Sequence, residues 1–391
     1  MPGRRPPRLG GTLILAVLAL AAAGGSLRCR PANREIIVGS ILSLSGEGEY
    51  YGKHIQQGMN LAVEELNRRG GIQGRPLRVV YRDSRSRPEA GRIHAEDLYR
   101  NLRIPAIIGA VLSSVTLAIA PIAESERRIL LSPASSSPKI TQAGSFIFRN
   151  YPSDVLEGAY MAEFASRELH LQRIAVLSVD NEYGKGLREI FRSRTEATGR
   201  KVILDLEFPQ EESGYPSLVS RIKEIDPDGV YLIGYYREVA RFLKIYRREG
   251  IDATILGVAG FHSGELLRLA GEAAEGVIFP YLSFDSESED LVVRRFIRDF
   301  HEEYGNAPDD WAAHGYDAVM ILAQAISRAG MAAEGIRDSL REMTAFHGAA
   351  GITRFDENGD VAHYPRIFIV HGGKFVAYKD YLFQRGREEN P

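Results

Sequence analysis

The chain has 391 residues, of which 44% are apolar and 26% charged, a balance typical of folded soluble domains rather than disordered or fibrous proteins. Lys and Arg total 49 against 51 Asp and Glu, so the charge gives no indication of a nucleic-acid partner. The single cysteine excludes cysteine-based zinc clusters, CxxC redox chemistry and internal disulfides. The nine histidines are scattered without an HExxH motif, so no metal site is predicted.

The first residues of the chain predict export. A basic segment, MPGRRPPRLGG, precedes an apolar run at 13–23 that is long enough for a signal peptide and too short to span a bilayer. Cys29 follows and resembles the acylated cysteine of bacterial lipoproteins, although the two residues before it depart from the usual pattern. The alternative is ordinary cleavage after 21–23. We expect 1–34 to be signal peptide and linker, with Cys29 a lipidation candidate and the mature chain in the periplasm or cell envelope.

From Glu35 onward, short β-branched runs alternate with amphipathic stretches. Residues 35–43 predict a buried strand, and 54–69 predict a helix with apolar residues at helical spacing. Those apolar residues are Ile55, Met59, Ala62, Val63 and Leu66. Further strands are predicted at 76–83, 106–110 and 128–132, and further helices at 88–102 and 116–126. This alternation predicts parallel strands joined by crossover helices, with both faces of the sheet covered.

The same pattern restarts after a pause at 149–154. Helices are predicted at 158–169, 183–197, 215–225 and 237–250, and strands at 173–179, 201–208, 229–234 and 253–257. Three helical segments follow without strands between them, at 290–305, 309–329 and 333–343, and then antiparallel strands at 352–379. The prediction is an α/β fold of two Rossmann-like, doubly wound lobes, with a chain that crosses between the lobes more than once.

Motifs of catalysis and cofactor binding are missing from the strand-exit loops. The glycines at 46–52 are spaced one residue too widely for the GxGxxG dinucleotide motif, and there is no P-loop or GxSxG motif. No cofactor is therefore predicted. A periplasmic serine hydrolase using Ser113 or Ser136 would need a paired base, and the nearest loop-edge histidines, His54 and His262, lie in no motif.

Three polar loops follow apolar strands and lead into helices, at 109–116, 132–138 and 179–186. In open α/β sheets ligands bind beyond the carboxyl ends of the strands, where helix N-termini offer free N–H groups and a positive dipole end. The hydroxyls of these loops therefore predict a cradle for a carboxylate. The candidate residues are Ser113, Ser114, Ser135 and Ser136, whereas Ser132 and Ser137 are expected to cap or turn the chain.

Tyrosines also lie at strand exits, in the segments EYYGK, NEYGK and GYYRE. A tyrosine offers an apolar wall and one hydroxyl, which suits an aliphatic or aromatic ligand. We expect Tyr51, Tyr183 and Tyr235 to line a binding site. Tyr50 and Tyr236 are expected to be ordinary core or rim aromatics.

Five segments together carry a family resemblance. LNRRGGIQGRPLRVVYRDSRSRPEA, ILLSPASSSPKIT, DNEYGKGL, GYDAVMILAQAI and FDENGD resemble, in order and spacing, the leucine/isoleucine/valine-type periplasmic binding proteins of ABC importers. The resemblance covers about 35–380. It implies two lobes that close over a small ligand, a three-crossing hinge, an ABC permease as partner and a monomeric state. A ligand sensor of the same fold that reports to a signalling partner is the alternative.

The resemblance also implies domain limits. It places 35–150 with 283–345 in the first lobe and 151–282 with 346–380 in the second, followed by a C-terminal tail at 381–391.

Site residues are carried over from the family position by position. Ser113 and the loop residues Ala134, Ser135 and Ser136 would hold the ligand carboxylate, and Tyr51, Tyr183 and Tyr235 would line the site. The position at which the family places an acid for the ligand ammonium falls on Ala259. Either another carboxylate substitutes, or the ligand is an organic acid or amide without an ammonium. The candidate substitutes are Glu182, Glu47 and Asp285.

Overall fold

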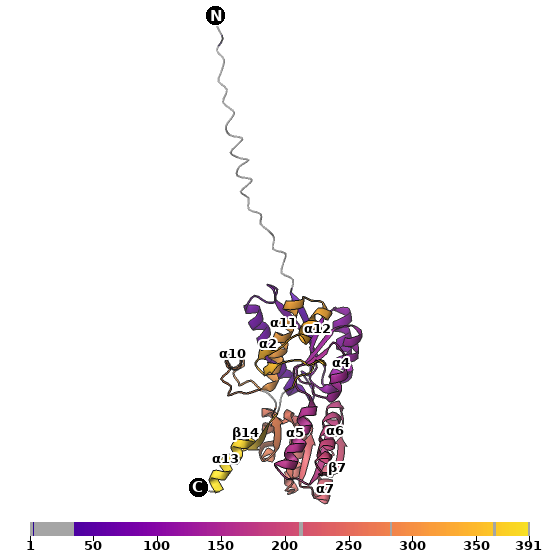
Figure 1. Ribbon diagram of the computed structural model, residues 1–391, viewed down its shortest axis with the longest axis vertical. Helices are drawn as coiled ribbons and strands as arrows, with labels where there is room; N and C mark the ends of the chain where they lie inside the picture. Colours follow the sequence, from indigo (N-terminus) through magenta and orange to yellow (C-terminus); the bar gives the residue numbers. More distant parts are fainter. Residues whose placement is uncertain (1–2, 4–34, 211–213, 282–283, 363–364, 390–391) are drawn as a thin grey trace.

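The computed structural model describes residues 3, 35–210, 214–281, 284–362 and 365–389. Two α/β lobes are stacked along the long axis of the molecule (Figure 1). The predicted α/β fold with two Rossmann-like lobes is confirmed. The predicted signal peptide and Cys29 lie outside the described residues. Among the described helices, none combines the length and the apolarity that a membrane crossing requires.

The first lobe contains a parallel sheet of five strands in the order β2-β1-β3-β4-β5. Its strands are β1 (Ile36–Leu42), β2 (Leu77–Asp83), β3 (Ala106–Gly109), β4 (Ile129–Ser132) and β5 (Ile147–Arg149). Its helices are α2 (Glu49–Arg68), α3 (Pro88–Glu96), η1 (Asp97–Asn101), α4 (Ser113–Ser125), η2 (Pro138–Gln142), α10 (Leu291–Tyr304), α11 (Asp310–Ala329) and α12 (Ala333–Arg341). The three late helices thus return to the lobe that the chain built first, and α11 packs against α2.

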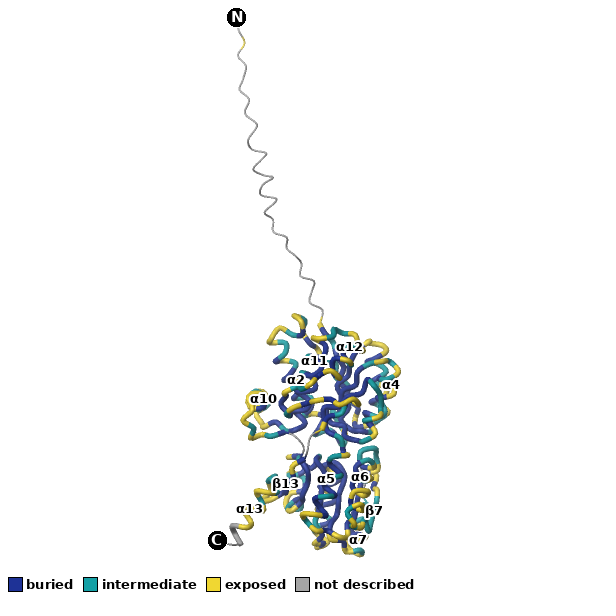
Figure 2. The backbone as a smooth tube through the Cα atoms, in the orientation of Figure 1, coloured by how far each residue is buried: buried dark blue, intermediate teal, exposed yellow. Residues whose placement is uncertain are grey.

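The second lobe contains seven strands in the order β14-β13-β10-β9-β8-β6-β7, parallel except where β13 and β14 join. Its strands are β6 (Arg173–Val179), β7 (Lys201–Phe208), β8 (Gly229–Ile233), β9 (Thr254–Leu256), β10 (Ile278–Tyr281), β13 (Arg366–His371) and β14 (Lys374–Ala377). Its helices are α5 (Asp154–Arg167), α6 (Glu182–Ala197), α7 (Tyr215–Ile225), α8 (Tyr236–Arg248), η3 (Ala259–Phe261), α9 (Gly264–Ala270), η4 (Gly271–Ala274) and α13 (Tyr378–Glu389). Buried segments run through the strands of both lobes (Figure 2).

Helix α2 shows how the sequence pattern positions the site. The predicted apolar face is buried at Ile55, Met59 and Ala62. Gly58 lets α11 approach closely, because a Cβ atom there would lie 1.9 Å from the carbonyl oxygen of Ala312. The helix begins at Glu49, earlier than the predicted start at residue 54, and this places Tyr51 in its first turn.

The last crossing between the lobes differs from the expected one. The hairpin of β11 (Phe346–Gly348) and β12 (Gly351–Thr353) contacts α11, and the buried Asp317 accepts hydrogen bonds from the backbone N–H groups of Ala349 at 2.7 Å and Ala350 at 2.8 Å. The expected assignment of 346–380 to the second lobe is therefore wrong for its first part. We propose that the boundary lies between residues 361 and 366.

The expected C-terminal features also differ from the structure. The meander predicted at 352–379 is divided: β12 pairs with β11, which lies before the predicted range, on the first lobe, and β13–β14 form a separate hairpin on the second. The expected tail at 381–391 is helical as far as Glu389, where α13 ends.

A buried ion pair joins the first and last crossings. The guanidinium of Arg149, which is fully buried, contacts Asp360 through two nitrogen–oxygen pairs at 2.7 Å. It also donates to the carbonyl oxygen of Ser137 at 2.9 Å and to the hydroxyl of Thr141 at 2.8 Å. Charge-assisted, bidentate pairs of this kind are among the stronger hydrogen bonds in proteins. The loop after β4 is thereby fixed to the last crossing.

Candidate functional site

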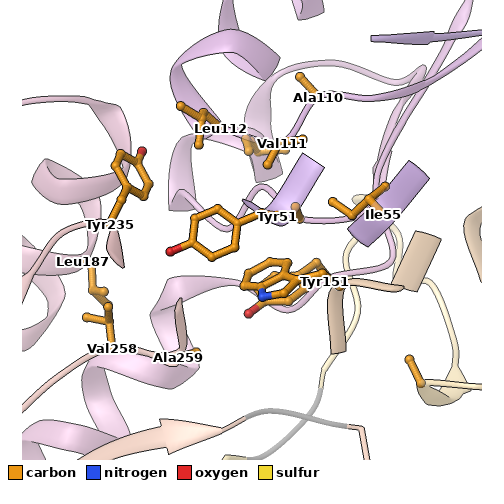
Figure 3. Close-up of a cluster of buried hydrophobic side chains, with 14 of the residues drawn as sticks. Tyr51, Ile55, Ala110, Val111, Leu112, Tyr151, Leu187, Tyr235, Val258 and Ala259 are labelled. Carbon is orange, nitrogen blue, oxygen red and sulfur yellow. The ribbon is translucent and has the colours of Figure 1, made fainter. Parts of the chain in front are cut away.

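A cavity lies between the two lobes, at the strand ends where open α/β folds bind small molecules. Residues of both lobes line it, and most of them are located where a strand ends and a helix begins. The lining residues are Tyr51, Val111, Leu112, Ser113, Ala134, Ser136, Tyr151, Glu157, Tyr183, Gly234, Tyr235, Ala259, Gly260 and Trp311. Figure 3 shows Tyr51 between the loop of Val111 and Leu112 on one side and Tyr151 on the other.

Two of the four predicted serines line this cavity. Ser113 is the first residue of α4 and is 2% exposed, and its Oγ accepts the backbone N–H groups of Ser136 at 3.3 Å and Ser137 at 3.2 Å. We call Ser113 and Ser136, with the first turn of α4, the serine cradle. The N-terminus of α4, with the positive end of the helix dipole, lies there, which favours an anion.

The other two predicted serines have different roles. The hydroxyl oxygen of Ser135 lies 2.7 Å from that of Thr116 and 3.1 Å from the carbonyl oxygen of Val111, to which it can donate. Ser135 therefore points away from the cavity and does not line it. Ser114 is half-buried and does not line the cavity. Ser132 donates to the carbonyl oxygen of Ala110 at 2.8 Å and accepts the N–H of Ser135, which is the turn-fixing role expected of it.

An aromatic wall surrounds the remaining space. Tyr183 and Tyr235 stack with ring centroids 5.7 Å apart, and the Trp311 ring lies 4.7 Å from Tyr51 and 5.2 Å from Tyr151. Burial raises the pKa of all four tyrosines above the ordinary value, so their hydroxyls stay neutral. These neutral surfaces suit an apolar ligand body.

Tyr51 connects the two lobes. Its hydroxyl donates to the carbonyl oxygen of Gly260 at 3.3 Å and accepts the backbone N–H of Tyr236 at 3.4 Å. A second contact between the lobes is an ion pair at the cavity rim, in which the guanidinium of Arg237 lies 3.0 Å from a carboxylate oxygen of Glu49. The lobes are therefore in contact around the cavity.

Ala259 lines the cavity, at the position where the family resemblance implies an acid, but the candidate acids for the missing carboxylate lie elsewhere. Glu182 pairs with Lys139 at 2.7 Å, Glu47 accepts from Gln210 at 3.1 Å, and Asp285 faces Arg366 at 3.6 Å. None of the three lines the cavity. The expectation that one of them replaces the acid at 259 is not supported by their positions.

Glu157 is the carboxylate that does line the cavity. It lies in the first turn of α5, is 2% exposed, and its Oε1 accepts the backbone N–H of Ala259 at 2.9 Å. The predicted helix began one residue later, at 158, so the sequence pattern gave no position for this side chain. An acid among apolar residues at a helix start was the available signal.

Tyr151 and Trp311 were missed for a similar reason. Tyr151 lies in the stretch at 149–154 that was interpreted only as a connection, and Trp311 lies in the first turn of α11, which was interpreted only as a helix. The two rings meet only because α11 returns to the first lobe and brings Trp311 against Tyr151.

Neither histidine considered for a hydrolase is near the serine cradle. His54 contacts Asp309 at 2.6 Å, and His262 stacks on Tyr281 with centroids 3.8 Å apart. Burial lowers the pKa of His262 to about 4. No histidine is among the described residues that line the cavity.

Two α/β lobes that meet over a largely apolar cavity with a few polar groups are the architecture of a two-lobed ligand-binding protein. Comparison with known proteins agrees with this class. The chain belongs to the periplasmic binding protein family, whose model matches residues 35–374.

Several relatives have been named or solved. The leucine-, isoleucine-, valine-, threonine- and alanine-binding protein of Pseudomonas aeruginosa is 27% identical over 324 residues, covering 82% of this chain and 86% of that protein. The leucine binding protein LivK of Thermotoga maritima is 32% identical with a TM-score of 0.83, covering 88% of this chain and 97% of that one. A solute-binding protein of R. palustris solved with benzoate shares the fold, with a TM-score of 0.80 and 21% identity over 88% of this chain and 95% of that one.

Proposed function

We propose that this protein is the extracytoplasmic solute-binding component of an ABC importer of the branched-chain amino acid type. It closes its two lobes over a small ligand that bears a carboxylate and an apolar body, and it delivers that ligand to a permease in the inner membrane. The observation that carries the proposal is the cavity between the lobes, with the serine cradle on one side and aromatic rings around it. Family membership and the names of the relatives support it.

The serine cradle would bind the carboxylate without a countercharge. Among the described lining residues there is no Lys or Arg, so the donors are the hydroxyls of Ser113 and Ser136 and the N–H groups at the start of α4. A carboxylate that accepts several such bonds is well stabilised in a site shielded from water. The aromatic wall, with Tyr183, Tyr235 and Trp311, would cover the apolar part of the ligand.

Closure couples binding to delivery. A ligand that contacts both lobes favours the closed arrangement over an open one, and the closed shape is what a permease would recognise. The contact of Tyr51 with Gly260 shows that the lobes approach closely enough for shared contacts. We place the protein in the periplasm, as family membership supports, and lipidation of Cys29 stays a prediction.

The first test measures thermal unfolding of the protein against a panel of small carboxylates. The panel contains leucine, isoleucine, phenylalanine, 4-methylpentanoate, 3-phenylpropanoate and benzoate. A ligand at about 100 times its Kd should add about 2.7 kcal/mol to the free energy of unfolding. Small-angle scattering should show the same ligand compacting the protein. If no member of the panel shifts the midpoint, the proposed ligand class is wrong.

A matched pair of variants tests the serine cradle. Ser113→Ala should weaken binding of the active ligand by about 1.5 to 3 kcal/mol, since a hydrogen bond to a charged group is lost. The neighbouring Ser114→Ala removes the same hydroxyl one residue away, outside the cavity, and should leave the affinity unchanged. Equal effects of the two variants would contradict the cradle.

A further inference from the structure

Glu157 and Ala259 lie side by side at the cavity wall. Position 259 carries only a methyl group, and its backbone N–H points at Oε1 of Glu157, 2.9 Å away. Ala259 and Glu157 both line the cavity. The carboxylate therefore reaches the cavity from α5 on the second lobe, beside the position at which the family resemblance puts the ammonium-binding acid.

Within the described chain, no cation compensates the charge of Glu157. Its one hydrogen bond comes from the Ala259 backbone, and no Lys or Arg forms an ion pair with it. Asp154 lies one turn earlier on the same helix and is also fully buried. Burial, and next the charge of Asp154, raise the pKa of Glu157 above its ordinary value. We call Asp154 and Glu157 the carboxylate pair.

The arginine that acts on the carboxylate pair, Arg149, already forms an ion pair with another acid. Arg149 opposes the charge of Asp154, but its guanidinium is engaged by both carboxylate oxygens of Asp360 and by Ser137 and Thr141. A buried carboxylate without a cation costs several kcal/mol. Such a cost at a cavity wall is relieved when the occupant of the cavity carries positive charge.

Resting on the proposed function, we propose that Glu157 binds an ammonium group of the ligand, so that the natural ligand is a zwitterionic amino acid with an apolar side chain and not a plain organic acid. The serine cradle takes the carboxylate on the first lobe, and Glu157 takes the ammonium on the second. The aromatic faces of Tyr183 and Tyr235 add a favourable surface for a cation and for the side chain. A plain organic anion would meet the charge of Glu157 and leave that carboxylate unpaired.

The test compares amino acids with their des-amino analogues by isothermal titration calorimetry. Leucine is paired with 4-methylpentanoate, and phenylalanine with 3-phenylpropanoate. The wild type should bind an amino acid of the panel more tightly than its des-amino partner. Glu157→Gln keeps an acceptor for the Ala259 N–H and removes the charge, so affinity for the amino acid should fall at least about 30-fold, the typical effect of breaking a buried charge pair. Affinity for the des-amino analogue should stay the same or rise.

Two further variants keep the result interpretable. Glu163→Gln removes the same charge from the same helix at a residue that pairs with Arg194 outside the cavity, and it should leave all affinities unchanged. The double variant Glu157→Gln/Ala259→Glu places the acid on the neighbouring wall and should recover most of the amino acid affinity. Thermal unfolding without ligand checks that each variant is folded.

The outcomes separate this inference from the proposed function. If des-amino acids or benzoate bind the wild type better than the amino acids do, the proposed function stands and the role of Glu157 is overturned. The same holds if Glu157→Gln leaves the preference for amino acids unchanged. If neither series binds, the carboxylate-binding function and this inference fail together.

Discussion

The first lobe meets the cavity with hydroxyl and N–H donors, whereas the second lobe meets it with a buried carboxylate. Both lobes were built by the same alternation of strands and helices, and in both the cavity residues lie at helix starts. Helix α4 starts at Ser113 without an acidic residue in its first turn, whereas α5 carries Asp154 and Glu157 in its first turn. Under the roles proposed above, the helix starts of the two lobes bind opposite charges of the ligand, and the side chains at each helix start decide which charge is bound.

The largest effect is expected from a substitution that removes the charge of Asp154, one member of the carboxylate pair on the second lobe. Burial raises the pKa of Asp154 to about 7, and the nearby Ser136 hydroxyl and the charge of Arg149 oppose this rise. Below about pH 4 the group is protonated in both folded and unfolded chains, and as pH rises toward 7 the unfolded chain releases its proton first, which lowers the free energy of unfolding. Asp154→Asn cannot ionise. Without ligand, it should become more stable than the wild type by about 2 to 4 kcal/mol between pH 4 and pH 8.

Urea unfolding at a series of pH values measures this difference. The difference in free energy of unfolding between Asp154→Asn and the wild type is measured at pH 4 as the reference. It should increase in favour of the variant as the pH rises. Asp252→Asn, at an exposed loop residue, serves as the control and should show no such widening. A constant gap between Asp154→Asn and the wild type at all pH values would contradict a buried, ionising Asp154.

An intermediate effect is expected where one lobe touches the other. Tyr51→Phe removes the hydroxyl that bonds Gly260 and the Tyr236 N–H. The loss of about 1 kcal/mol should weaken ligand affinity about fivefold, and scattering should show a larger open fraction at equal ligand concentration. Tyr304→Phe removes a comparable bond within the first lobe, to the carbonyl oxygen of Gln57, and should change stability but not affinity. An affinity loss in both variants would mean that Tyr51 has no special role in closure.

The smallest effect is expected at the rim, where the charges of the two lobes are reversed. There the first lobe contributes the acid, Glu49, and the second contributes Arg237. Both side chains are partly exposed, so Arg237→Ala should cost less than about 1 kcal/mol of ligand affinity, and the loss should shrink at high salt. Arg268→Ala breaks a pair with Glu265 inside the second lobe and should leave affinity unaltered. A loss of affinity that does not depend on salt would point to packing instead of charge.

Sequence reasoning reached the fold because the hydrophobic periodicity of strands and helices is local, as on the apolar face of α2. It also reached Ser113, Ser136, Tyr183 and Tyr235, because strand exits converge in an open α/β sheet. It could not separate Ser135 from Ser136, since neighbouring residues of a loop point in different directions and only the structure shows Ser135 bonded to Thr116.

Other parts of the site required long-range information. Trp311 follows Tyr51 by hundreds of residues in sequence and meets it only because α11 packs on α2. The hairpin at 346–353 was assigned to the second lobe because the order of elements does not reveal that Asp317 binds its backbone. Glu157 was overlooked because a carboxylate near a helix N-terminus is usually a favourable surface residue, and only the structure shows that it is buried beside Ala259.

The buried pair of Arg149 and Asp360 gives ligand capture an order in time. Because Arg149 also donates to the carbonyl oxygen of Ser137, the loop that carries Ser136 is held to the hinge at Asp360. A ligand would then arrive carboxylate first, on a surface that is already complete, and meet Glu157 only in the last part of the movement. Its residence time would be governed by how often the hinge reopens, so a tighter hinge would slow release to the permease even with every cavity contact unchanged.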